Sequence, residues 1–151
     1  MLRPLCFAFA LSIISCGEPP NHLKGSVLEV HDMTFTSVSI SRIDNYLVIE
    51  YQKGADGAGG KVAKLSVYVA DLTIAPGNSV DLTLAAPGTN PRATLQRIVE
   101  GTIDLGVERG SITFDKAPDP GAETSGKFSI TTKAPAGRNL NGNFKATVVQ
   151  K

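Results

Sequence analysis

The chain contains few side chains of the kinds that carry out catalysis or bind metals. Its 151 residues include two cysteines and two histidines, too few for a zinc or iron–sulfur centre built from those ligands alone. No Gly-x-Ser-x-Gly segment is present, so a strand-to-helix serine nucleophile is not predicted. We expect no cofactor, no metal and no catalytic residue. Carboxylates that stand near turns leave two alternatives open, a calcium ion and an envelope hydrolase; they are Asp71, Asp81, Asp104, Asp115 and Asp119.

Two short segments have the residue types of known sites but lack the rest of the pattern. His31-Asp32 is similar to the paired core of metal-dependent phosphohydrolases, yet His22 is the only other histidine. The glycine-rich segment 54–61 ends in lysine, as a phosphate-binding loop does. Ala55 stands where that loop needs glycine, and Val62 stands where it needs serine or threonine. A flexible hairpin connection is therefore expected at 54–61.

The strongest signal lies at the start of the chain. Met1-Leu2-Arg3 carries one positive charge, residues 5–14 form an apolar run, and the run ends at Ser15-Cys16-Gly17. This order is typical of a secretory signal and is too short for a comfortable membrane span. Ile13-Ile14-Ser15-Cys16 resembles the lipobox of bacterial lipoproteins. The resemblance covers residues 1–17 and implies that Cys16 is acylated after the preceding residues are removed.

The lipobox divides the chain into three parts. Residues 1–15 are the predicted signal peptide, which contains the other cysteine, Cys6; residues 16–23 are a lipidated start and short tether; residues 24–151 are a single domain without thiols. The tether from Gly17 to Leu23 reaches roughly 25 Å when fully extended, so the domain should stay close to the bilayer. Glycine rather than aspartate after Cys16 favours the outer over the inner membrane of a bacterial envelope.

Composition limits the partners of this domain. Lys and Arg together number 15 against 14 Asp and Glu, so no strong positive charge points to nucleic acid. Aromatic residues are 6% of the chain and tryptophan is absent, which argues against a site built on stacked rings. Hydrophobic residues make up 42%, enough for a folded core.

Turn signals and strand-forming residues alternate through the domain. Glycine- and proline-rich turns separate short runs of Val, Ile, Thr, Phe and Tyr. This pattern predicts an all-β fold, either an antiparallel β-sandwich (jelly-roll or Ig-like) or a partly open barrel, preceded by the cleaved signal helix. Residues 91–100 fit both a capped helix and a strand, and we favour the strand because no other segment offers a helix partner.

The first of two hairpins can be aligned by hand. Placing Leu47 opposite Val67 pairs apolar residues on one face, and it pairs Tyr46 with Tyr68 and Glu50 with a lysine on the other. A slip of one residue would invert every side chain. The alignment is therefore well determined.

The second hairpin is suggested by a repeated Gly-x-Phe pattern, which occurs as Gly126-Lys-Phe and again as Gly142-Asn-Phe. Placing Phe128 opposite Phe144 sets Lys127 opposite Lys145, a mildly unfavourable pair, and it sets Ser129 opposite Asn143 and Thr131 opposite Asn141. No acidic residue follows Glu123, whereas five basic residues do: Lys127, Lys133, Arg138, Lys145 and Lys151. This hairpin therefore predicts a flat polar face with a basic edge.

The function expected from these features is a membrane-anchored bacterial lipoprotein that carries a non-catalytic binding or structural β module. Lys127, Lys145, Asn141 and Asn143 are the candidate docking residues for an anionic head group or acidic glycan. A carbohydrate-binding module is the first alternative, with Tyr46 and Tyr68 as the only plausible outward aromatic pair. An envelope protein that pairs through an open sheet edge is another.

Overall fold

The structure is a computed structural model that describes residues 20–54, 59–88 and 91–151. The expected signal peptide and Cys16 lie outside the described residues. Strands dominate the described part, which has a single short 3-10 helix, η1 (Ser26–Glu29). The strands are β1 (His22–Lys24), β2 (Ser37–Ile43), β3 (Tyr46–Gln52), β4 (Lys61–Tyr68), β5 (Ser79–Asp81), β6 (Ala93–Arg97), β7 (Ile103–Asp104), β8 (Val107–Phe114), β9 (Glu123–Thr132) and β10 (Asn139–Gln150).

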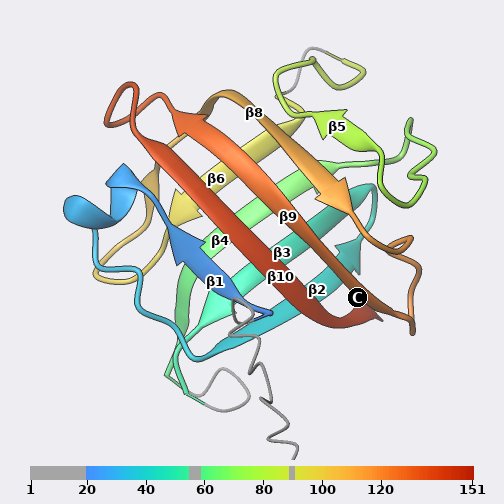
Figure 1. Ribbon diagram of the computed structural model, residues 1–151, viewed down its shortest axis with the longest axis horizontal. Coiled ribbons are helices and arrows are strands. Elements are labelled where there is room, and N and C mark those ends of the chain that lie inside the picture. Colours follow the sequence, from blue (N-terminus) through green and yellow to red (C-terminus); the bar gives the residue numbers. More distant parts are fainter. Residues whose placement is uncertain (1–19, 55–58, 89–90) are drawn as a thin grey trace, which may run out of the picture.

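All ten strands join one mixed sheet in the order β5-β8-β9-β10-β2-β3-β4-β6-β7, with β1 added beside β10. Strand β10 links two layers. Its first part pairs with β9 and β1 in sheet A (β5, β8, β9, β10 and β1), and its end pairs with β2 in sheet B (β2, β3, β4, β6 and β7). Figure 1 shows β9 and β10 crossing over the strands of sheet B. The expected all-β architecture, a sandwich or an open barrel, is confirmed.

One pair of strands departs from the antiparallel pattern. β10 and β2 run parallel, with Val148 beside Ile40, whereas every other pairing among the described strands is antiparallel. Parallel neighbours need a long crossover between them. Here β3 to β9 lie between the two strands in the sequence.

The core lies between the two layers and follows from strand alternation. Every second residue is buried along β9 and, from Ala63 onward, along β4, as the two-residue side-chain period of a strand requires. The largest fully buried side chains come from both layers: Tyr51, Phe114, Phe144, Ile40, Leu47, Ile49, Leu65, Leu95, Leu105, Ile112, Ile130 and Leu140. Because both inner faces contribute, the layers are held together mainly by apolar burial.

Tyr51 connects the layers through a polar contact as well. It is 1% exposed, and its ring packs edge-on against Phe35 and Phe128 at centroid distances of 4.7 and 6.4 Å. Its hydroxyl donates a 2.9 Å hydrogen bond to the backbone carbonyl of Asn143 on β10. Burial raises the pKa of the phenol far above its usual range, so Tyr51 acts here as a neutral donor.

The first hairpin forms in the predicted register. Leu47 lies opposite Val67, Tyr46 opposite Tyr68, and Glu50 opposite Lys64. Glu50 forms its ion pair not with Lys64 but with Lys61 at the start of β4, whose ammonium lies 2.5 Å from the Glu50 carboxylate. Residues 91–100, which fitted both a helix and a strand, contain the favoured strand, β6, which pairs with β4.

The predicted register of the second hairpin is wrong by two residues. Phe144 lies opposite Gly126, and Phe128 lies opposite Gly142. A Cβ atom on Gly126 would lie 2.6 Å from the ring of Phe144, and one on Gly142 would clash with the ring of Phe128. Each phenylalanine thus covers a glycine of the other strand. The shared Gly-x-Phe pattern sets the register through these reciprocal pairs rather than through a pair of phenylalanines.

The corrected register changes the polar face of the hairpin. Lys127 lies opposite Asn143 rather than Lys145, and Lys145 lies opposite Ser125. The other predicted pairs shift in the same way, so that Ser129 faces Asn141 and Thr131 faces Asn139. Because the shift is an even number of residues, the predicted side chains keep their outward direction.

Candidate binding surface

The outer face of sheet A consists of polar side chains aligned across five strands. Residues directly opposite each other on neighbouring antiparallel strands point to the same side. One row runs from β5 to β1 through Ser79, Thr113, Lys127, Asn143 and His22. The next row runs through Asp81, Ser111, Ser129, Asn141 and Lys24, and a shorter third row contains Arg109, Thr131 and Asn139. We call this surface the polar face.

Two shallow depressions occupy the polar face. One, of about 430 Å³, is lined mainly by residues of the first two rows, including Lys127, Asn141 and Asn143. The other, of about 520 Å³, extends toward β5 and includes Asp81 and Arg109. Ser111 and Ser129 line both depressions. The polar face is therefore one continuous open surface rather than a deep pocket.

Charge on the polar face is moderately positive. Its three rows contain the cations Lys24, Lys127 and Arg109 and one carboxylate, that of Asp81. Hydrogen bonds from the Thr83 hydroxyl (2.6 Å) and backbone amide (2.8 Å) hold the pKa of Asp81 below its usual value. The carboxylate is consequently ionised near neutral pH and is not suited to act as a general acid.

Two of the five basic residues that follow Glu123 are paired with carboxylates. The Lys145 ammonium lies 3.2 Å from the Glu123 carboxylate, and the Arg138 guanidinium lies 2.8 Å from that of Glu29. Lys127 has no ion-pair partner in the part of the chain that the structure describes. The basic edge expected from the sequence is thus weaker than the count of lysines suggests, and Lys127 is its central cation.

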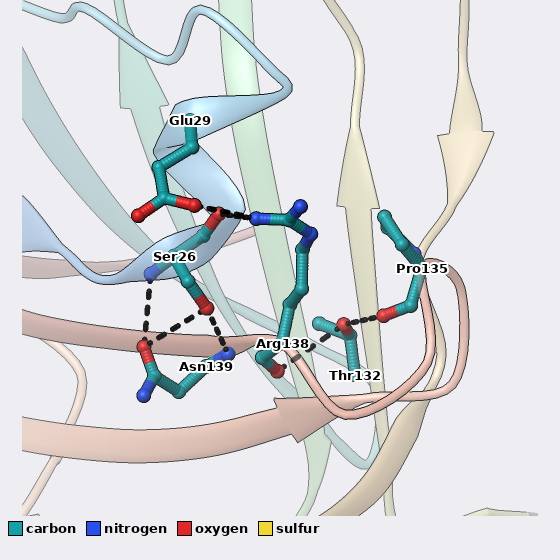
Figure 2. A network of polar contacts seen from close by, with 6 residues as sticks. All are labelled: Ser26, Glu29, Thr132, Pro135, Arg138 and Asn139. Atoms are coloured by element: carbon teal, nitrogen blue, oxygen red, sulfur yellow. Dashed lines mark hydrogen bonds and ion pairs between the residues drawn. The ribbon is translucent and has the colours of Figure 1, made fainter.

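The segment that follows the predicted tether is fastened to the end of the β9–β10 hairpin (Figure 2). Arg138 donates to the backbone carbonyl of Ser26 at 2.7 Å and to Glu29 at 2.8 Å. The backbone amides of Ser26 and Asn139 each donate to the other's side-chain oxygen, at 2.9 and 3.0 Å. Gly25 permits this approach because a Cβ atom there would lie 2.7 Å from the Asn139 side chain.

Strand β1 places the start of the described chain on the polar face. His22 pairs with Asn143 and Lys24 pairs with Asn141, and the Asn21 side chain accepts a 2.6 Å hydrogen bond from the Lys145 backbone amide. The sheet therefore begins at His22, inside the segment 16–23 that the sequence suggested as a tether. Cys16 is five residues from Asn21, about 17 Å at full extension.

Tyr46 and Tyr68 lie on the other side of the molecule. They are opposite each other on β3 and β4, on the outer face of sheet B. Their ring centroids are 5.3 Å apart and the ring planes meet at 79°. A sugar chain stacks on rings that lie roughly in one plane, so this edge-to-face pair is not a flat stacking platform.

Other kinds of site find little support in the described residues. Within them, no group of three or more His, Cys, Asp or Glu side chains is arranged to hold a metal ion. The strands at the sheet edges, β1, β5 and β7, have three, three and two residues, which leaves little backbone for the addition of another strand. No helix among residues 20–54, 59–88 and 91–151 has the length and hydropathy needed to cross a bilayer.

The sequence identified only part of the polar face. Lys127, Asn141 and Asn143 lie together on it, whereas Lys145 lies beyond the three rows and is paired with Glu123. The contributions of β1, β5 and β8 were missed. Alternation of Arg109, Ser111 and Thr113 with apolar residues is the one local signal that marked β8 as having a polar side.

In comparisons with known proteins, no family model, no curated protein and no solved structure matches the chain.

Proposed function

We propose that this chain is a lipid-anchored protein of the bacterial envelope, acylated at Cys16, whose polar face binds an anionic glycan without catalysis. The outer membrane is the favoured location because glycine follows Cys16. The observation that carries the proposal is the set of cross-strand rows, which bring hydrogen-bonding groups from five strands onto one open surface beside the predicted tether.

The chemistry of the rows fits a hydroxyl-rich partner with acidic groups. Serine and threonine hydroxyls and asparagine amides both donate and accept hydrogen bonds, as sugar hydroxyls do. Lys127 and Arg109 supply positive charge for carboxylate or phosphate groups, with Asp81 the single opposing charge in the rows. The open depressions suit a polymer or head group lying along the surface better than a small molecule enclosed by protein.

Affinity for such a ligand should depend on electrostatics. The three rows contain no Phe, Tyr or Trp side chain, so apolar stacking contributes little, and neutral sugars should bind weakly. Charge attraction at an exposed surface is screened by salt. Binding should therefore weaken as the ionic strength rises.

Binding of polygalacturonate, compared with that of neutral dextran, tests the proposal. The lipidated protein in detergent micelles should bind polygalacturonate and not dextran. Lys127→Gln should weaken binding about fivefold, since one surface lysine contributes ~1 kcal/mol toward an anionic surface. Lys64→Gln is the matched control because Lys64 lies on the outer face of sheet B. Equal effects of the two substitutions, or equal binding of the two polymers, would contradict the proposal.

A further inference from the structure

A second surface lies where β10 leaves sheet A and joins sheet B. Two large apolar side chains are exposed there, Ile43 at 37% and Val149 at 52%. Ile43 is opposite Tyr46, and Tyr46 is opposite Tyr68. Val149 lies beside Ser41, the residue two positions before Ile43 on β2. We call Ile43, Tyr46, Tyr68 and Val149 the corner patch.

The composition of the corner patch is that of a membrane interface. Tyrosine has an apolar ring and a polar hydroxyl, and it is enriched where a bilayer meets water. Ile43 and Val149 add apolar side chains that can enter the head-group boundary. Asp44, at the tip of the β2–β3 hairpin beside Ile43, limits the depth of insertion because a carboxylate does not enter the hydrocarbon region readily.

The predicted anchor can place the corner patch on the bilayer. The backbone amide of Lys145 donates a hydrogen bond to the Asn21 side chain. Val149 is four residues farther along β10 than Lys145, a distance of about 13 Å at the rise of a strand. Cys16 is five residues from Asn21, so an extended tether of about 17 Å can reach Val149. Figure 1 shows β1 beside the first part of β10 and β2 beside its end. Strand β1 and the corner patch thus adjoin the same edge of β10.

We infer that the corner patch rests in the interfacial layer of the membrane that carries the lipid anchor. This inference depends on the proposed acylation of Cys16. The three rows of the polar face belong to sheet A and the corner patch to the outer side of sheet B. Docking through the patch therefore leaves the polar face toward the aqueous space, where an envelope glycan can reach it.

Single tryptophan reporters test this orientation, because the chain has no native tryptophan. Three variants of the full lipidated protein are compared in phosphatidylglycerol–phosphatidylcholine vesicles whose acyl chains carry bromine: Ile43→Trp, Val149→Trp and, on the polar face, Thr131→Trp. Bromine quenches a tryptophan that lies within the bilayer interface. The fluorescence of the two corner-patch reporters should be quenched several-fold more than that of Thr131→Trp.

Flotation of the same vesicles separates the two proposals. If the protein floats and all three reporters are quenched alike, or Thr131→Trp is quenched most, the corner-patch inference is overturned while the anchor stands. If the protein does not float with the vesicles, the anchor proposal fails and the inference fails with it. Far-ultraviolet circular dichroism of each variant confirms that the exposed tryptophan leaves the sheet folded.

Discussion

Replacing Gly142 by alanine tests the reciprocal packing that sets the register beneath the polar face. A Cβ atom at this position would lie 2.5 Å from Cε1 of Phe128 and 2.9 Å from Cδ2 of Leu23. Carbon atoms in contact are normally ~3.5–4.0 Å apart, so the buried ring must move by roughly 1 Å. Overpacking of this kind costs about 1–3 kcal/mol, and removing a strand glycine returns about 0.5–1 kcal/mol.

We therefore expect Gly142→Ala to lower the free energy of unfolding by roughly 0.5–2 kcal/mol. Urea unfolding of the chain from Gly17 onward, followed by far-ultraviolet circular dichroism, measures this change. A second substitution, Phe128→Leu, should relieve the clash, so that the double variant is less destabilised than the sum of the two single variants. A rise in stability for Gly142→Ala alone would refute the packing, because that is the result expected at an ordinary strand glycine.

Three further predictions concern the same domain. Cysteines replacing Lys127 and Asn143, which lie directly opposite each other, should form a disulfide on oxidation. Cysteines replacing Lys127 and Lys145 should not, because these two positions are diagonal and their Cα atoms exceed the ~7 Å limit for a disulfide. Peptide mass mapping detects either bond. Tyr51→Phe should lower stability by about 1 kcal/mol in urea unfolding, since it removes the bond to the Asn143 carbonyl, and no loss would contradict that bond. Hydrogen bonds from the Arg92 side chain lower the pKa of Asp71 in the fold. The contribution of Asp71 to stability is therefore present above the unfolded pKa of 3.8 and is lost as the pH falls through the lower folded pKa. Thermal unfolding of Asp71→Asn should depend less on acid than that of the wild type, and an unchanged acid dependence would contradict this.

The two hairpins show what the sequence can determine about register. In β3 and β4 the apolar residues and the charged pair agree on a single alignment, and Leu47 lies opposite Val67 as predicted. In β9 and β10 the alternation of polar and apolar residues is preserved by a shift of two. The alternation of polar and apolar residues therefore cannot distinguish two registers that differ by an even number of residues. The deciding contacts are Phe128 over Gly142 and Phe144 over Gly126, which depend on ring packing in three dimensions.

The full extent of the polar face could not be predicted because it depends on strand order. Lys24 and Asn141 are neighbours on the face although more than a hundred residues separate them in the chain. The antiparallel pairing of β1 with β10 decides which residues adjoin the start of the described chain. Long-range pairings of this kind leave no local signal, whereas the strand character of Lys127 and its outward direction follow from the local alternation.

The central claim is that Cys16 carries the lipid that fixes this domain beside a bacterial membrane. Intact-mass measurement of the protein extracted from membranes tests it most directly. The account predicts a chain that begins at Cys16 and carries the added mass of a diacylglyceryl group, with or without a further acyl chain. A membrane-extracted protein that retains residues 1–15, or that lacks added acyl mass at Cys16, would contradict it.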